Sequence, residues 1–189
     1  PDYVVTPRYW VSETDVNERL AAKDWEKGWL IGWRDVTSAH VLRTAIPSVI
    51  PRVGVGHTMP LLFSKLKPEL LACLLANFSS MSLDYIARLK VGGTHLTYGY
   101  LKQFPILPPE RYTEDDLAYI VPRMLELTYT SHDLALWAKD LGYESEPFTF
   151  DPTRRAILRA ELDAYYAKLY GLSRDELRYI LDPSDVLGD

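Results

Sequence analysis

The sequence contains few of the residues that build covalent or metal-bound frameworks. One of its 189 residues, Cys73, is a cysteine, so an internal disulfide is excluded. Cys73 lies in an apolar helical pattern and is expected to be a small core residue. The four histidines do not pair with one another, with cysteine or with carboxylates at the spacing of zinc ligands, which argues against a metal site. We expect a protein of a reducing compartment, the cytoplasm.

Signals for a membrane and for catalysis are also scarce. No apolar run approaches the ~18 residues that a membrane-spanning helix needs. The stretch "VGVGHT" (53–58) has glycines but lacks the Lys-Ser/Thr ending of a phosphate-binding loop, and no nucleophile elbow is present. "LPPERY" (107–112) is not the Asn/Asp-Pro-Pro-Tyr/Phe box that binds a flipped adenine, because Leu107 takes the polar position. We therefore assign no catalytic residue and no cofactor to this chain, and expect it to bind rather than react.

Acidic residues are rare in one long segment, 34–102. That segment has eight Lys/Arg and three Asp/Glu, a net charge of +5, while the remainder has 13 Lys/Arg and 23 Asp/Glu, a net charge of −10. Such a division indicates a basic face for an anionic partner beside an acidic remainder, although chance clustering gives the same pattern. The three acids are scattered, which disfavours a nuclease with a magnesium site. They are Asp35, Glu69 and Asp84.

The order of expected elements predicts an α+β fold. Strand-like stretches at 28–36, 43–51 and 53–63 suggest a small mixed sheet with irregular loops, and Pro47 makes the second an edge strand or a bulge. Helices are expected after Ser12, at 67–78 and after Ser80 or Ser82. From Thr113 onward the chain reads as helices capped by Thr113, Asp151 and Ser173, with a kink or restart at Pro122. We divide the chain into an α/β domain, 1–109, and a helical part, 110–189.

The stretch "KVGGTHLTYGYLKQFPILPP" (90–109) suits neither a helix nor a regular strand. It forms part of a longer resemblance that covers nearly the whole chain. "GWLIGWRDVTSAHVLRTAIPSVIPRVGVGHTMPLLF", "LLANFSSMSLDYIARLKVGGTHLTYGYLKQFPILPP" and "RAELDAYYAKLYGLSRDELRYILDP" resemble the C-terminal region of large adenine-specific DNA methyltransferases. These enzymes belong to bacterial restriction-modification and phage-exclusion systems. The middle block is also similar to the target recognition domains of type I restriction specificity subunits.

The resemblance implies a target recognition domain whose catalytic half lies elsewhere. The first residue is Pro1 rather than Met, so we expect a piece of a longer protein. Double-stranded DNA and the catalytic domain of the parent chain are the expected partners, and S-adenosylmethionine is expected in that absent domain. The net charge of −5 departs from a typical isolated DNA binder. The alternative function is a protein-interaction module of a phage-defence complex, in which the acidic helical half makes the contact.

Two glycine-containing turns are the expected DNA-facing loops. Gly92 and Gly93 would let the backbone approach a duplex without a Cβ, while Tyr98 and Tyr100 support the loop or contact sugar. The alternatives are that Gly92 and Gly93 only end a helix and that 53–59 is a hairpin bend. Exposed arginines are also commonly only solvated. The candidate DNA contacts are Arg34, Thr37, Arg43, Arg52, His57, Thr58, Lys90, Gly92, Gly93, Thr94, His95 and Lys102.

Overall fold

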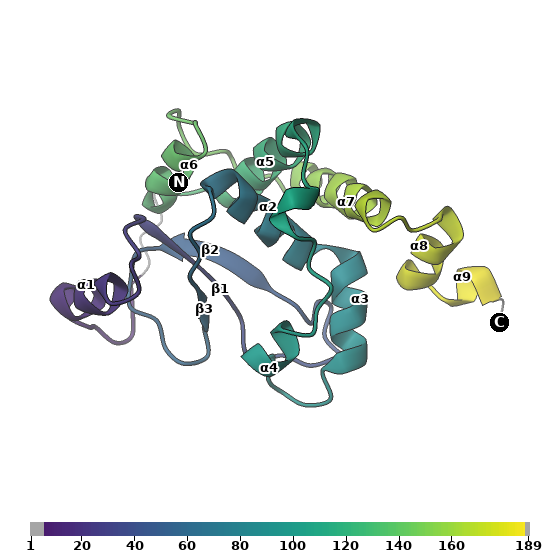
Figure 1. Ribbon diagram of the computed structural model, residues 1–189, viewed down its shortest axis with the longest axis horizontal. Helices are drawn as coiled ribbons and strands as arrows, with labels where there is room; N and C mark the ends of the chain where they lie inside the picture. Colours follow the sequence, from purple (N-terminus) through teal and green to yellow (C-terminus); the bar gives the residue numbers. More distant parts are fainter. Residues whose placement is uncertain (1–5, 188–189) are drawn as a thin grey trace.

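The computed structural model describes residues 6–187 and has the α+β fold expected from the sequence (Figure 1). Among these residues the sheet has three strands, β1 (Trp29–Trp33), β2 (Pro47–Pro51) and β3 (Leu61–Leu62). Their order is β2-β1-β3, and both pairings are antiparallel. All five residues of the central strand β1 are buried. The third extended segment, expected over 53–63, forms a strand only at its end.

Strand β2 lies at an edge of the sheet, one of the two possibilities that Pro47 indicates in the sequence. Arg34 donates its backbone N–H to Ile46 at 2.9 Å, and the register then makes Gly32↔Ser48 the next hydrogen-bonded pair. Pro47 and Pro51 therefore occupy the alternate positions, whose N–H would point away from β1. Because proline has no N–H, these two residues remove donors from an edge that could otherwise pair with another chain.

Of the four helices that the structure describes in the N-terminal half, one has a side-chain cap. The four helices are α1 (Glu13–Ala21), α2 (Pro68–Ser79), α3 (Met81–Lys90) and the short α4 (Tyr98–Leu101). The Ser80 hydroxyl accepts from the Leu83 N–H and caps α3. Ser12 takes the N-cap position of α1 but makes no capping hydrogen bond.

The C-terminal half is helical. It contains η1 (Pro109–Arg111), α5 (Glu114–Thr128), η2 (His132–Leu134), α6 (Ala135–Asp140), α7 (Pro152–Leu169), α8 (Arg174–Leu181) and α9 (Ser184–Leu187). Thr113 and Ser173 form capping boxes, and Asp151 caps α7. Pro122 lies inside α5, which is continuous rather than restarted. Gly171 ends α7 with a φ of 74°, which few other residues adopt.

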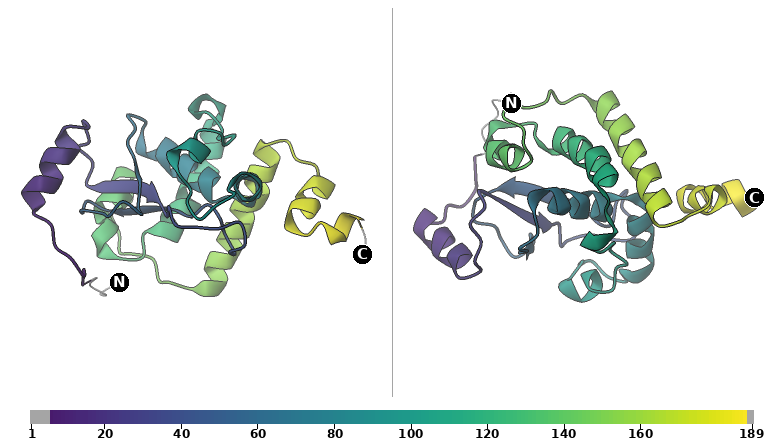
Figure 2. Two further views of the ribbon diagram at one scale, coloured as in Figure 1. Left: turned by 90° about the horizontal axis from the view of Figure 1, so that it is seen from below. Right: turned by 45° about the horizontal axis from the view of Figure 1, so that its top comes forward.

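One large hydrophobic core joins the two halves of the chain. Helix α2 packs against the sheet, and α5 and α7 pack beside it (Figure 2). Members of this core include Trp29, Ile31, Leu71, Cys73, Leu75, Ile120, Met124, Trp137, Leu162 and Tyr166. Residues from both sides of the expected boundary at 109/110 are thus buried together, and the boundary itself stays a prediction.

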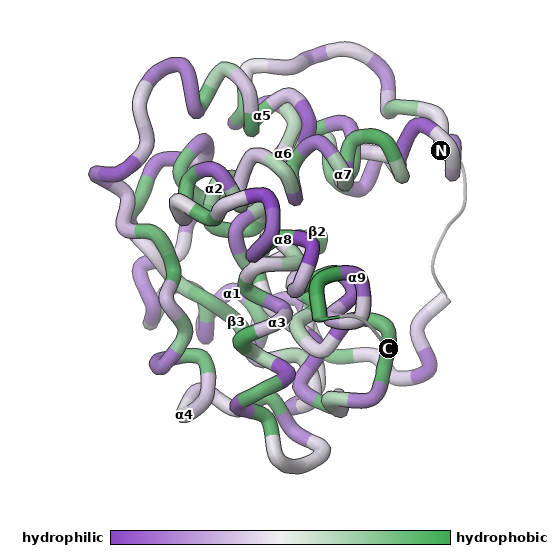
Figure 3. Tube along the Cα trace, turned by 90° about the vertical axis from the view of Figure 1, so that its right-hand side faces the viewer, coloured by the Kyte–Doolittle hydropathy of each residue, from purple (hydrophilic) through white to green (hydrophobic). Residues whose placement is uncertain are grey.

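Two tyrosines of α7 pack against other helices. Tyr166 is fully buried and donates its hydroxyl to the Cys73 carbonyl at 2.7 Å. Tyr165 stacks on Tyr119, with ring centroids 4.1 Å apart. Beyond α7, helix α8 packs on α3 and is followed by α9 (Figure 3). Tyr179 of α8 meets Tyr85 of α3 edge-on.

Candidate nucleic-acid interface

The backbone that continues β1 holds both glycine-containing turns along one edge of the sheet. Asp35 donates its N–H to the Thr58 carbonyl at 3.0 Å and accepts from the Leu96 N–H at 2.7 Å. Thr37 then donates its N–H to Thr94 at 3.0 Å. Segments 53–60 and 91–97, which we call the loop edge, therefore lie side by side beyond β3, at the lower side of the molecule in Figure 1. The two turns are more than 30 residues apart in sequence, and Asp35 joins them.

Two aromatic side chains hold segment 91–97 in place. The Trp33 indole donates to the Leu96 carbonyl at 2.6 Å, and the Tyr98 hydroxyl donates to the Leu61 carbonyl at 2.7 Å. The two rings meet edge-on with centroids 4.8 Å apart. Phe104 is buried just beyond α4, so the chain returns to the core there. Tyr98 thus has a supporting role in the structure.

Three of the four glycines of the loop edge have no internal reason to be glycine; the exception is Gly54, where a Cβ would collide with the Val11 side chain. A Cβ added to Gly56, Gly92 or Gly93 would meet no atom within 4 Å, and none of the three has a left-handed φ. Elsewhere the reason is visible: at Gly32 a Cβ would collide with the Pro60 carbonyl, and Gly171 has a positive φ. The open space at the loop edge leaves room for an external group to approach the backbone closely.

Unpaired positive charge surrounds the two turns. Arg34, Lys90 and Lys102 are exposed, and in the described part of the chain none of them forms an ion pair. The acids of the same segment are mostly hidden, because Asp35 is 8% exposed and Asp84 is 1% exposed. The positive charge of Arg34, Lys90 and Lys102 is therefore not offset by Asp35 or Asp84.

The two loop histidines differ in their partners. His95 places Nδ1 2.7 Å from an oxygen of Asp35, and slightly more than half of its side chain is exposed. His57 is exposed, as are its neighbour Thr58 and, in the other turn, Thr94. The Asp35 carboxylate orients the His95 ring from beneath. The sequence did not indicate this role of Asp35, and the signal available was an acid two residues after a buried strand in a basic segment.

Three other candidates use their polar groups inside the protein. Thr37 is buried and donates its hydroxyl to the Thr44 carbonyl at 2.7 Å. Arg43 forms an ion pair with Asp163 of α7 at 3.2 Å. Arg52 donates to Asn17 and to the carbonyls of Trp25 and Lys27, each at 3.1 Å. These three side chains hold segments together, so we leave them out of the proposed binding surface.

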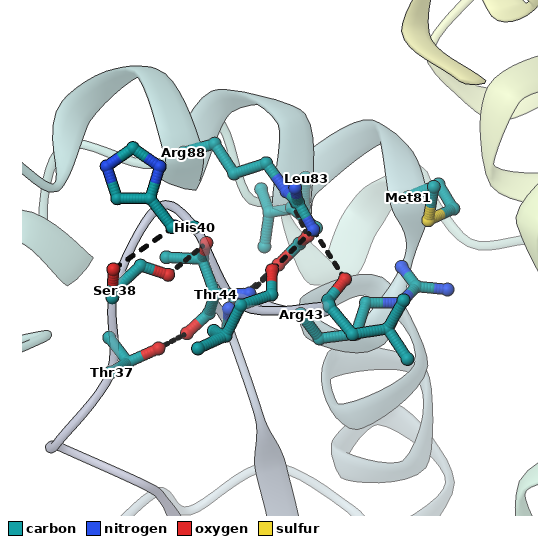
Figure 4. Close-up of polar contacts among 12 residues, drawn as sticks. Thr37, Ser38, His40, Arg43, Thr44, Met81, Leu83 and Arg88 are labelled. Atoms are coloured by element: carbon teal, nitrogen blue, oxygen red, sulfur yellow. Dashed lines mark hydrogen bonds and ion pairs between the residues drawn. The ribbon is translucent and has the colours of Figure 1, made fainter. Parts of the chain in front are cut away.

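The loop between β1 and β2, residues 38–45, is fixed from one side by α3 (Figure 4). We call it the pinned loop. An oxygen of Asp84 accepts the N–H groups of Thr44 and Ala45, each at 2.8 Å. Arg88 bonds the other oxygen of Asp84 at 3.0 Å and donates to the carbonyls of Val41 and Leu42. One buried carboxylate thus orders the pinned loop.

Comparisons with protein families, with curated proteins and with solved structures found no match for this chain. Within residues 6–187 no group of three His, Cys, Asp or Glu side chains could hold a metal ion. In the same range no single helix is long and apolar enough to cross a membrane. Helices α2 and α3 taken together have the required length and composition, with a bend of 58° between them.

Proposed function

We propose that the loop edge binds double-stranded DNA and reads its sequence. The observation that carries this proposal is the set of three glycines, Gly56, Gly92 and Gly93, that no internal contact or φ angle requires. All three lie on exposed turns that Asp35 joins. A backbone without side chains can approach a phosphate or a base edge closely, and its N–H groups are then donors.

The side chains around these turns suit the two kinds of contact that a sequence-specific DNA-binding protein makes, with phosphates and with base edges. Arg34, Lys90 and Lys102 neutralise phosphates on either side of the turns. His57, Thr58, Thr94 and His95 carry short donors and acceptors that reach base edges in a groove. The Asp35 carboxylate holds the Nδ1 edge of the His95 ring. The ring therefore loses little conformational freedom when it binds.

The chemistry of a methyltransferase would then belong to another part of a longer cytoplasmic protein. The described residues supply a recognition surface and a helical scaffold. In this proposal the acidic helical part, 110–189, docks on the catalytic domain, where S-adenosylmethionine binds. The restriction-modification or phage-defence setting comes from the sequence resemblance.

Charge reversal at two lysines tests the proposal. Lys90→Glu with Lys102→Glu should weaken binding to a random-sequence duplex and reduce the slope of log K against log salt by about two, since each phosphate contact contributes ~0.9. Fluorescence anisotropy over a series of salt concentrations measures the slope. The control is Lys23→Glu with Lys139→Glu, two exposed lysines away from the loop edge. An unchanged slope in the first variant contradicts the proposal.

A protein-binding role is the second candidate, and exposed apolar side chains favour it. Leu42 is 90% exposed on the pinned loop, and Leu89 is 68% exposed beside Arg88, whose side chain bonds that loop. Isolated apolar residues are common on surfaces, but two neighbours suit a protein contact. If the chain does not retard a random duplex at low salt at any concentration, this second function is favoured over DNA binding.

A further inference from the structure

A cavity on the opposite edge of the sheet has a different character from the loop edge. It has a volume of about 320 Å³ and lies between β2, α2, α5 and α7. Apolar side chains such as Leu75 and Leu162 form part of its wall, and Arg43, Arg155, Arg159 and Asp163 supply its charges. We call it the arginine cavity. Because β2 and β3 are on opposite sides of β1, this cavity is separate from the loop edge.

The one carboxylate in the arginine cavity is already occupied. Asp163 accepts the Met81 N–H at 2.7 Å on one oxygen and the Arg43 guanidinium at 3.2 Å on the other. Arg43 also donates to the Ser79 carbonyl at 3.3 Å. This ion pair links the chain just before β2 to α3 and α7.

Arg155 and Arg159 are one helical turn apart on α7. The Arg155 guanidinium donates to the Leu127 carbonyl at 2.8 Å and lies 4.5 Å from the Phe150 ring centroid. Arg159 donates to the Arg155 carbonyl at 3.3 Å. Within the described residues neither forms an ion pair. Burial, followed by the nearby charge of Arg159, lowers the pKa of Arg155, as expected for two guanidiniums that repel each other.

Neighbouring arginines show that this lack of partners is local. Arg154 on the same helix bonds Glu126 at 2.8 and 2.9 Å, and Arg123 on α5 bonds Glu161 at 2.8 Å. Arg123 and Arg154 are thus matched with carboxylates. The two that line the arginine cavity are not, and with Arg43 and Asp163 they give the cavity a net charge of +2.

From this charge, volume and lining we infer that the arginine cavity binds a small organic phosphate monoester. A phosphate monoester carries about −1.5 to −2 charges at neutral pH, which matches the net +2. The guanidiniums of Arg155 and Arg159 have the donor geometry that phosphate oxygens accept. The apolar wall covers the organic part of the ligand, and the volume lies at the lower end of the ~300–1,000 Å³ range of ligand sites. This site does not depend on DNA binding at the loop edge.

Calorimetric titration with four probes tests the inference: adenosine 5′-monophosphate, cytidine 5′-monophosphate, unphosphorylated adenosine and inorganic phosphate. At least one nucleotide should bind more tightly than both adenosine and inorganic phosphate. Arg155→Gln with Arg159→Gln should weaken that binding at least tenfold. The matched control is Arg19→Gln with Arg174→Gln, two exposed arginines that form no ion pair among the described residues, and it should bind as the unaltered chain does.

A second variant distinguishes loss of the binding site from loss of the folded structure. Ser48→Phe adds bulk to the cavity from the edge strand β2 and leaves the arginines in place. It should also weaken nucleotide binding at least tenfold, while the circular dichroism spectra and melting temperatures of both variants stay close to those of the unaltered chain. Failure of both nucleotides to bind, or equal binding by inorganic phosphate, overturns the inference. Unchanged binding in a folded Arg155/Arg159 variant also overturns it.

Discussion

The pinned loop and the loop edge are built from similar residues but use them differently. In the pinned loop, Arg43 and the backbone of Thr44 are bonded to carboxylates on α7 and α3. In the loop edge, the glycines at 92 and 93 face open space, and Lys90, directly before it, is exposed. A polar side chain whose bonds are already made inside the protein contributes to stability, and one without a partner is available to a ligand. Arginine or threonine in a loop does not by itself indicate a binding residue.

The largest expected effect is on the pinned loop. Asp84→Ala should lower the free energy of unfolding by about 3–5 kcal/mol, because two buried N–H groups and the Arg88 guanidinium lose their acceptor. Urea denaturation measures this change. The control is Glu144→Ala, which removes an exposed carboxylate. A loss as small as that of the control would mean that the carboxylate does not hold the pinned loop.

A pair of single changes should separate stability from binding. Arg43→Gln should lower the free energy of unfolding by about 1–2 kcal/mol, because a partly screened charged hydrogen bond is lost, with an unchanged salt slope of duplex binding. Lys90→Gln should do the reverse, leaving stability within about 0.5 kcal/mol and reducing the slope by ~0.9. Denaturation and anisotropy on the same samples give both quantities. The comparison of the loops is wrong if Arg43→Gln alters the slope and Lys90→Gln does not.

The smallest expected effect on stability is at the loop-edge glycines. Gly92→Ala with Gly93→Ala should change the free energy of unfolding by less than about 0.5 kcal/mol, since each Cβ meets open space. Gly32→Ala is the comparison variant. It should lower the free energy of unfolding by about 1–3 kcal/mol, because its Cβ would collide with the Pro60 carbonyl. Thermal and urea unfolding distinguish the two. A large loss in the Gly92/Gly93 variant would give these glycines an internal role.

Local signals in the sequence predicted the parts of the fold that depend on nearby residues. The caps Thr113, Asp151 and Ser173 and the edge position of Pro47 are set within a few residues, and the structure confirms them. The extended segment at 53–60 was less predictable, because its backbone bonds to the rest of the described chain go only to Trp33, the last residue of β1, and to Asp35 beyond it.

The candidate site was predictable only in part, because the partners of its side chains are remote in sequence. Arg43 and Asp163 are 120 residues apart, and nothing near Arg43 indicates that pairing. Arg52 likewise bonds Asn17, 35 residues earlier. Lys90, Lys102 and the glycines of 91–97 could be identified because a lysine or glycine on an exposed turn needs no distant partner to be explained.

The most direct test of the loop edge as a DNA-binding surface is a titration of the ¹⁵N-labelled chain with a random-sequence duplex, followed by amide chemical shifts. The account predicts that the largest shift changes fall on residues 56–58 and 92–95, with small changes on the pinned loop and on α7. Largest changes on the acidic helices of 110–189, or no change at any amide at low salt, would contradict it.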